Sequence, residues 1–219
     1  QDHEASFFPA GGHSLVAETT YHEDLDCICA GPWLEKLMQE RYGRWATKFW
    51  LAADQSVYFP AEQRAENTIP RVAFYARGST SRRAVELGLL ALEYLAGKNI
   101  VFHVDVFGSD SNRERLKLAK FAYTDHGVLN DVKLGDLYRN CDVGMVFSAT
   151  NYSLVPQEMM ACGLAVLEMD GDNTRSVYPE GGVVLANPHP RELGKQLEAP
   201  RWEFPTLFLT SPRSESDGV

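Results

Sequence analysis

Basic and acidic side chains occupy turns next to apolar runs, where their chemistry suits the binding of a nucleotide. Arg77 directly follows the apolar run 71–76, and Arg82 precedes the next apolar segment. Guanidinium groups can chelate phosphate oxygens, and the free backbone N–H groups at the start of a helix favour an anion. Glu158 lies just inside a short helix expected after the turn 150–155, where its carboxylate could accept hydrogen bonds from ribose hydroxyls. Together these residues suit a nucleoside diphosphate.

Each of these residues also has a simpler explanation. An arginine after a strand is usually a solvated surface charge, and a glutamate in the first turn of a helix usually complements the helix dipole. His126 could contact a base or serve only as a turn residue, because it lies at a strand end where nothing local demands a charge. The occurrence of Arg77, Arg82 and Glu158 at one edge of one sheet favours the binding site.

The elements that would position these residues alternate along the chain. Apolar runs predict strands, and helical periodicity predicts helices between them. The expected strands are 71–76, 100–108, 142–148, 164–169 and 182–186, and the expected helices are 84–97, 130–141 (capped by Asn130 or Asp131) and 189–198. This alternation predicts an α/β fold with a parallel sheet flanked by helices. In such sheets ligands bind beyond the carboxyl ends of the strands.

The beginning of the chain predicts a different unit. One face of an expected helix over 32–43 carries apolar residues, between an apolar run at 26–31 and an expected strand at 46–52; they are Trp33, Leu34, Leu37, Met38 and Tyr42. These strands are too few for a full domain. Because the first residue is Gln1 and not Met, we expect a chain excised from something longer. The stretch 53–70 is polar, has two prolines and lacks periodicity, so we expect a linker.

The expected division of the chain therefore has three parts. Residues 1–59 form a partial α/β segment, the tail of a preceding Rossmann-like domain with the start of the linker. Residues 60–200 form a complete nucleotide-binding domain. Residues 201–219 form a polar C-terminal tail, expected to be disordered.

Composition limits the partners. The net charge of −9 argues against nucleic-acid binding, which needs a basic stripe, and no apolar run approaches a membrane span. The four cysteines lack the spacing of a zinc or redox site and are interpreted as buried thiols in a reducing compartment; they are Cys27, Cys29, Cys141 and Cys162. The histidines form no ligand cluster. We therefore expect no metal and no cofactor, with a nucleotide bound as substrate.

With these motifs in view, the chain resembles the retaining GT-B glycosyltransferases that use nucleotide-sugar donors, the group of sucrose and glycogen synthase-like enzymes. Arg77 and Arg82 match the family's Gly-Arg and the lysine that follows it, and "LYRNCDVGMVFS" (137–148) matches a family helix–strand pair. The strongest match is the family's second glutamate with Met-Ala-Cys-Gly, here Glu158 and 160–163. The resemblance implies the C-terminal, donor-binding Rossmann-like domain of a GT-B enzyme.

Roles for individual residues follow from this resemblance. It implies that Glu158 contacts the nucleotide ribose, and that the diphosphate is held by Arg77, Arg82 and the backbone of Ser153 and Leu154. The nucleobase is expected near Gly108, His126, Gly127, Val128 and Leu129. The sugar-side loop departs from the family: Thr150 stands where the family's first glutamate contacts the transferred sugar, and Asn151 and Tyr152 with Ser153 replace Gly-Phe-Gly. We nominate no catalytic residue.

A more specific resemblance is to bacterial rhamnosyltransferases of surface-polysaccharide assembly. It is carried by "QDHEASFFP" (1–9), "FYARGSTSRRAVELGL" (74–89), "HGVL" (126–129) and "TNYSLVPQEMMACG" (150–163). It implies transfer of L-rhamnose from dTDP-rhamnose to a glycan acceptor, in the cytoplasm and at the inner face of the membrane, with peripheral membrane association through a region absent here. The segment alone is expected to be nearly inactive, because most of the acceptor-side domain is missing.

Two other functions stay open. A non-catalytic GT-B module that binds a nucleotide would explain Thr150 in place of a glutamate. A sugar-nucleotide 2-epimerase shares the architecture, although its catalytic carboxylates and histidine would come largely from the absent domain. Rhamnosyl transfer by the full-length protein would separate these functions.

Overall fold

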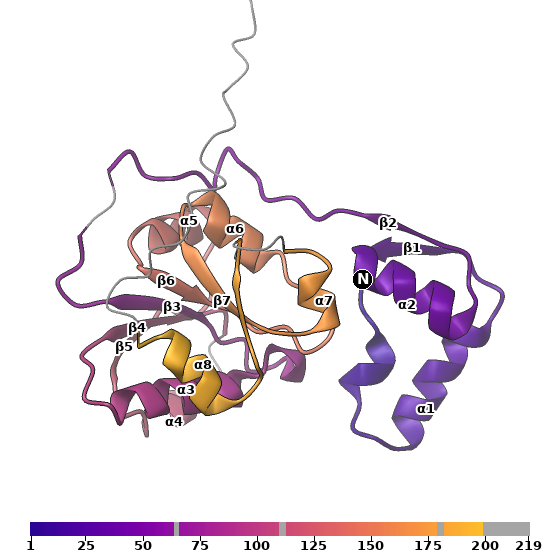
Figure 1. Cartoon of the computed structure of the whole chain (residues 1–219), viewed down its shortest axis with the longest axis horizontal. Coiled ribbons are helices and arrows are strands. Elements are labelled where there is room, and N and C mark those ends of the chain that lie inside the picture. Colours follow the sequence, from indigo (N-terminus) through magenta and orange to yellow (C-terminus); the bar gives the residue numbers. More distant parts are fainter. Residues whose placement is uncertain (64–65, 110–112, 179–181, 199–219) are drawn as a thin grey trace, which may run out of the picture.

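The computed structural model describes residues 1–63, 66–109, 113–178 and 182–198, and the expected tail at 201–219 lies outside them. A six-stranded, all-parallel sheet has the order β5-β4-β3-β6-β7-β8 (Figure 1). Its strands are β3 (Arg71–Tyr75), β4 (His103–Phe107), β5 (Ala122–Asp125), β6 (Val143–Met145), β7 (Ala165–Met169) and β8 (Val184–Ala186). The predicted parallel sheet is confirmed.

The strand order reverses beside β3. The chain runs outward from β3 through β4 to β5 and then returns to place β6 on the other side of β3. Neighbouring connections therefore leave the sheet in opposite directions at β3 and β6, which opens a crevice at their carboxyl ends. The turns carrying Arg77 and Thr150 follow these two strands.

Helices cover both faces of this sheet. Figure 1 shows α5 and α6 on one side and α3 with α8 on the other. The helices are α3 (Val85–Ala96), α4 (Arg113–Leu116), α5 (Asp131–Arg139), α6 (Val155–Ala161), α7 (Asp172–Arg175) and α8 (Pro190–Gln196), with a 3-10 turn η3 (Ser81–Arg83). Of the two caps expected for α5, Asn130 is the one observed: its side chain accepts a hydrogen bond from the N–H of Lys133 at 3.0 Å.

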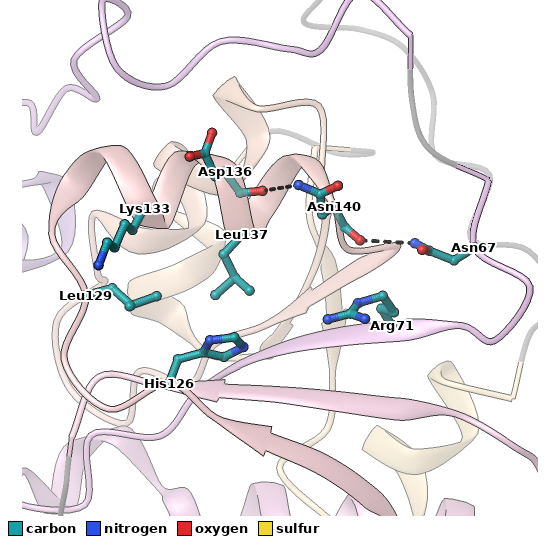
Figure 2. A pocket seen from close by; sticks show the side chains of 8 residues that line it. All are labelled: Asn67, Arg71, His126, Leu129, Lys133, Asp136, Leu137 and Asn140. Atoms are coloured by element: carbon teal, nitrogen blue, oxygen red, sulfur yellow. Dashed lines mark hydrogen bonds between the residues drawn. The ribbon is translucent and has the colours of Figure 1, made fainter.

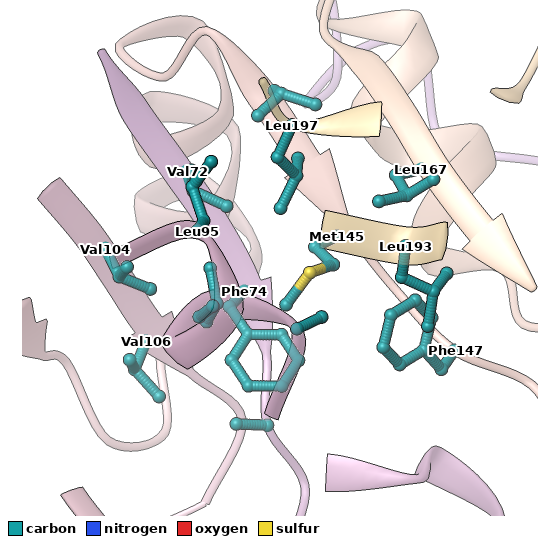
Figure 3. Packing of buried hydrophobic residues seen from close by; sticks show 14 of the residues in the cluster. Val72, Phe74, Leu95, Val104, Val106, Met145, Phe147, Leu167, Leu193 and Leu197 are labelled. Atoms are coloured by element: carbon teal, nitrogen blue, oxygen red, sulfur yellow. The ribbon is translucent and has the colours of Figure 1, made fainter. Parts of the chain in front are cut away.

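The core beneath α3 and α8 follows from the alternation of side chains along the strands. Val72 and Phe74 of β3 point to this face, while Ala73 points to the other. Figure 3 shows them packed with side chains of the neighbouring strands and helices: Leu95, Val104, Val106, Met145, Phe147, Leu167, Leu193 and Leu197. Gly88 lets α3 approach, because a Cβ there would lie 2.4 Å from the Phe74 ring.

The beginning of the chain, residues 1–52, forms a smaller unit with a two-stranded parallel sheet, and we call it the first unit. It comprises η1 (Glu4–Phe7), α1 (Gly12–Thr19), η2 (Thr20–His22), β1 (Cys27–Ala30), α2 (Pro32–Tyr42) and β2 (Ala46–Phe49). The apolar face expected on α2 buries Leu34, Met38 and Tyr42 against these strands. Other large apolar side chains of this unit are exposed, including Ile28 at 71% and Trp45 at 62%.

Two features differ from the sequence expectations. Strand β5 had no predicted range, although His126 was expected at a strand end, because residues 122–124 are exposed and form no apolar run. The expected linker 53–70 contains no helix or strand in its described residues, but its Tyr58 is buried against Tyr138 of α5. The connection therefore packs against the large sheet's helices instead of bridging the two units freely.

The remaining expectations concern cysteines and membranes. None of the four cysteines forms a disulfide, and three are buried while Cys27 is half-buried. No helix in the described ranges is both long enough and apolar enough to cross a membrane.

Candidate functional site

A cleft of about 470 Å³ opens beyond the carboxyl ends of β3 and β4, and we call it the strand-end cleft. It brings together five residues nominated from the sequence: Arg77, Gly108, Val128, Leu129 and Glu158. They come from four separate segments that follow β3, β4 and β5 or begin α6. This is the position that the topology of a doubly wound sheet predicts for a ligand.

The floor of the cleft is aromatic and tightly packed. Tyr58, Tyr75, Phe107 and Tyr138 all line it. Gly108 has a φ of 103°, and a Cβ on it would lie 2.6 Å from the Tyr75 ring, so only glycine fits there. An aromatic lining with a few polar groups at its rim is typical of small-molecule sites.

Glu158 is the acidic group at the rim. Its carboxylate forms no hydrogen bond or ion pair with any described residue. Burial raises its pKa to about 7, and the nearby charge of Asp131 adds to this shift. A half-buried carboxylate without a protein partner is costly, and hydroxyl donors from a ligand would offset that cost.

Tyr138 places a second unsatisfied group in the cleft. The side chain is 1% exposed, and its hydroxyl has no hydrogen-bond partner within the described ranges. Burial raises the pKa of this phenol, and the charge of Glu158 raises it further. The hydroxyl therefore stays protonated and is available as a donor.

Arg77 supplies the positive charge. Its side chain is exposed, lines the cleft and has no ion-pair partner in the described part of the chain. The backbone N–H groups of Ser153 and Leu154 likewise have no acceptor among the described residues. Donors of this kind suit phosphate oxygens.

Arg82 lies in a different environment. It forms an ion pair with Asp2, and its guanidinium lies 4.9 Å from the centre of the Phe7 ring. Thr150 and Asn151 bind the same carboxylate, through the Thr150 hydroxyl at 3.0 Å and the Asn151 N–H at 2.9 Å. We call these four residues, Asp2, Arg82, Thr150 and Asn151, the Asp2 junction.

The third residue of the sugar-side loop also meets the first unit. The Tyr152 hydroxyl accepts a hydrogen bond from the backbone N–H of Leu51 at 3.2 Å. Its ring packs so close to Gly31 that a Cβ on Gly31 would lie 2.4 Å from it. The structure therefore separates the nominated residues into an open cleft and a closed junction.

His126 points away from the cleft. Its Nε2 lies 2.8 Å from Oδ1 of Asp105, a fully buried carboxylate that also accepts from Arg71 at 2.6 Å. His126 and Arg71 line a groove of about 550 Å³ along α5, and Figure 2 shows them opposite Lys133 and Leu137. The neighbouring Gly127 has a φ of 61°, and its carbonyl accepts from the N–H of Gly108 at 2.8 Å.

A buried polar network holds the start of the turn after β6, which leads to Thr150. Arg83 donates to the Ser148 hydroxyl at 2.9 Å, and Glu168 accepts from both the hydroxyl and the N–H of Ser148. Burial lowers the pKa of Arg83 and raises that of Glu168 to about 8. Because Ser148 begins the turn after β6, this network fixes where that turn starts.

Sequence reasoning did not nominate several groups found here. Tyr58 lies in an aperiodic stretch, Tyr138 lies inside an expected helix, and Asp2 belongs to the stretch 1–9 that carries the resemblance but had no role assigned to it. The preference of buried tyrosine hydroxyls for a partner was the one usable signal. Among the residues that the structure describes, no group of three His, Cys, Asp or Glu side chains could hold a metal.

Comparisons with known proteins show the family to which the chain belongs. Residues 70–198 match the family model described as WsaF, C-terminal domain. The O-antigen biosynthesis protein RfbC of Myxococcus xanthus is 33% identical over 193 residues, which are 87% of this chain and 15% of that protein. The chain thus spans only a small part of this relative.

Solved structures show the fold. Sucrose-phosphate synthase from Thermosynechococcus elongatus superposes with a TM-score of 0.71 at 19% identity, over 89% of this chain and 55% of the other. The C-terminal domain of a group 1 glycosyl transferase, LpcC from Francisella tularensis, gives 0.52 at 16% identity, over 67% and 86%. Anabaena HepE, solved with UDP and glucose, gives 0.58 at 14%, over 78% and 52%. The six-stranded unit has the fold of GT-B C-terminal domains, as predicted.

Proposed function

The chain belongs to the family of WsaF C-terminal domains, and from that membership we propose that it is the donor-binding part of a GT-B glycosyltransferase. The observation that carries this proposal is the strand-end cleft, where Arg77 and Glu158 face a ligand-sized space without protein partners. A cationic group and a carboxylate at one cleft match the two ends of a ribose diphosphate.

In this proposal each part of the donor meets a different part of the cleft. Arg77 and the N–H groups of Ser153 and Leu154 hold the diphosphate, and Glu158 accepts hydrogen bonds from the ribose. The nucleobase lies toward Gly108 and the loop 126–129, with Val128 and Leu129 at the cleft. The loop Thr150–Tyr152 is proposed to face the sugar. Arg82 extends the diphosphate site from the junction side.

Catalysis in this proposal is mainly electrostatic. The developing charge of the departing diphosphate is stabilised by fixed donors that need no rearrangement during the reaction. The acceptor is held for attack on the same face of the sugar, and its orientation lowers the entropic part of the barrier. No protein nucleophile is required, and we assign none.

The donor and acceptor are proposed from resemblance and from the named relative. The motifs at 74–89, 126–129 and 150–163 resemble those of rhamnosyltransferases, which supports dTDP-L-rhamnose as the donor. The name of RfbC supports a glycan of the O-antigen type as the acceptor. Four cysteines without a disulfide suit a reducing compartment, which supports a cytoplasmic enzyme.

We also propose that residues 1–59 end an acceptor-side domain. The two-stranded sheet of this unit carries α2 on one side, while Ile28, Trp45, Phe49 and Trp50 remain exposed. So many exposed apolar side chains in so small a unit indicate a surface that further protein covers. Residues 60–200 would then be the donor domain.

Calorimetric titration of the chain with dTDP, dTMP and UDP tests the proposal. We expect modest affinity, because no second domain closes over the cleft and excludes water. dTDP should bind more tightly than dTMP, since the second phosphate adds contacts to Arg77 and the free N–H groups. Equal affinities would remove the diphosphate role of Arg77, and no binding by the folded chain would refute donor binding.

A second candidate, a nucleotide-binding module without catalysis, is favoured by one observation. Thr150 stands where the sucrose and glycogen synthase-like GT-B enzymes that the chain resembles carry a glutamate, and its hydroxyl is buried against Asp2. Such a module would bind dTDP, yet the full-length protein would transfer no sugar. An assay of rhamnosyl transfer by the full-length protein decides between the two.

A further inference from the structure

The loop after β6 is bound by the first unit at every one of three consecutive residues. Thr150 and Asn151 donate to the carboxylate of Asp2, and Tyr152 accepts from Leu51. The side-chain amide of Asn151 also donates to the carbonyl oxygens of Gln1 at 2.8 Å and Ala30 at 2.6 Å. The position of this loop therefore depends on the first unit.

The Asp2 carboxylate is the centre of these contacts. Its side chain is 2% exposed, and both of its oxygens are used. Oδ1 accepts from the N–H of Asn151 and from its neighbour His3, while Oδ2 accepts from Thr150 and Arg82. A carboxylate that is buried, paired and fully hydrogen-bonded holds its partners in one arrangement.

The partners of Asp2 lead directly to the donor cleft. Arg82 lies in η3, within the segment that begins at Arg77 after β3, and the N–H of Ala149 donates to the Arg82 carbonyl at 2.9 Å. On the other side, the loop continues into Ser153 and Leu154, whose N–H groups are free in the described chain, and then into the helix of Glu158. One side chain of the first unit thus contacts both turns that border the cleft.

We propose that Asp2 is a positioning residue for the nucleoside diphosphate, which sets the places of Arg82 and of the Thr150–Asn151 turn and so makes donor affinity depend on the contact between the two units. This inference rests on the proposed donor site. It adds that the unit expected on the acceptor side takes part in shaping that site. Displacement of the first unit would release Arg82 and the loop together, and the cleft would lose affinity for the diphosphate.

Asp2→Asn tests the proposal, because it keeps the shape of the side chain and removes its charge. Titration should show about a tenfold loss of affinity for dTDP and little change for dTMP, since Arg82 is no longer held by a charge-assisted bond. In an Arg82→Ala background, the same change should have a clearly smaller effect, because the part that Asp2 exerts through Arg82 is already lost and only the part through the Thr150–Asn151 turn remains. Asp24→Asn is the matched control: Asp24 lies in the same unit, is fully exposed and pairs only with Arg44 at 3.6 Å.

Failure of the inference and failure of the proposed function give different results. A lower melting temperature with unchanged dTDP affinity would make Asp2 merely structural. Tighter dTDP binding would show that Asp2 competes with phosphate; either of these results overturns the inference and leaves the proposed function standing. Failure of the unaltered chain to bind any nucleotide would refute the proposed function, and the inference with it. If Asp2→Asn does not fold, Thr150→Val removes only one bond to Asp2, and a loss of about two- to threefold for dTDP is expected. Unchanged affinity there would equally contradict the inference.

Discussion

The strand-end cleft and the Asp2 junction lie at the same edge of the sheet, but they differ in whether their charged groups have protein partners. In the strand-end cleft, Glu158, Tyr138 and Arg77 have polar groups without protein partners in the described chain. In the Asp2 junction, a few residues away, the carboxylate of Asp2 is fully hydrogen-bonded by the protein. Both halves are built from turns that follow parallel strands.

The difference has a physical meaning. An unsatisfied buried polar group costs about 1–3 kcal/mol, so a folded protein keeps such groups where something else completes them. In the junction the Asp2 carboxylate is fully hydrogen-bonded, although Nε of Arg82 and Oδ1 of Asn151 are buried there without a partner in the described chain; in the cleft the carboxylate of Glu158 has no protein partner, and we propose that a ligand supplies one. A change in the junction should therefore alter stability first, and a change in the cleft should alter binding first.

The largest effect is expected beside the junction, at the contact between Gly31 and Tyr152, from Gly31→Ala. Gly31 has a φ of 98°, and a Cβ there would lie 2.4 Å from Tyr152. Backbone strain and overpacking together should destabilise the folded protein by about 2–4 kcal/mol, measured by denaturant unfolding. Gly43→Ala is the control, because Gly43 also has a positive φ, 63°, but a Cβ there meets nothing within 4 Å. Equal costs for the two variants would show that the contact between Gly31 and Tyr152 beside the junction is loosely packed.

The next effect belongs to the cleft, from Arg77→Ala. Loss of the charge-assisted hydrogen bonds should weaken dTDP binding by about 1.5–3 kcal/mol and bring it close to that of dTMP. Unfolding should change little, because the side chain is exposed and has no ion pair with a described residue. Arg115→Ala removes an exposed arginine paired with Glu86 and should leave binding unchanged. A loss of dTDP affinity no larger than that for dTMP would place the diphosphate elsewhere.

The cleft was more predictable from sequence than the junction. Strands β3, β4, β6 and β7 are buried apolar runs, so their ends, and with them Arg77, Gly108 and Glu158, could be placed at one edge. Strand β5 was missed because an exposed edge strand has no such run. The order of strands was not predictable either, since nothing local records which neighbour a strand takes.

Long-range contacts explain the remaining misses. Asp2 and Arg82 are separated by 80 positions, and a carboxylate beside Gln1 carries no mark of such a partner. Tyr58 joins the cleft from a stretch with no periodicity, and the ring of His126 is directed by Asp105, a residue in the middle of β4. The motifs predicted the residues proposed to contact a ligand. The residues that hold those side chains in place could be identified only from the folded structure.

A similar or smaller effect on binding is expected from Glu158→Ala. Loss of hydrogen bonds from the ribose to a charged acceptor should weaken dTDP binding by about 1–3 kcal/mol in calorimetry. Stability at pH 8 should be unchanged or slightly higher, because the variant no longer buries a carboxylate that lacks a partner. Unchanged affinity with a large loss of stability would show that Glu158 is structural, which would also erase the contrast with the junction.

The smallest effect is the pH dependence of stability from the same residue. The pKa of Glu158 is about 7 in the folded protein against an ordinary value of 4.5, so between these pH values the folded state holds more protons than the unfolded state. Stability must then fall as pH rises through that window. Glu158→Gln should flatten this part of the profile, whereas Glu168, whose pKa is also raised, contributes equally in both proteins. Denaturant unfolding from pH 5 to 8 measures the difference in slope between the stability profiles of the two proteins. The affinity for dTDP should change in the opposite direction: if the ionised carboxylate accepts from the ribose, dTDP affinity should rise across the same pH interval. Parallel stability profiles for the two proteins would mean that Glu158 already has a partner, and the cleft would then be as closed as the junction.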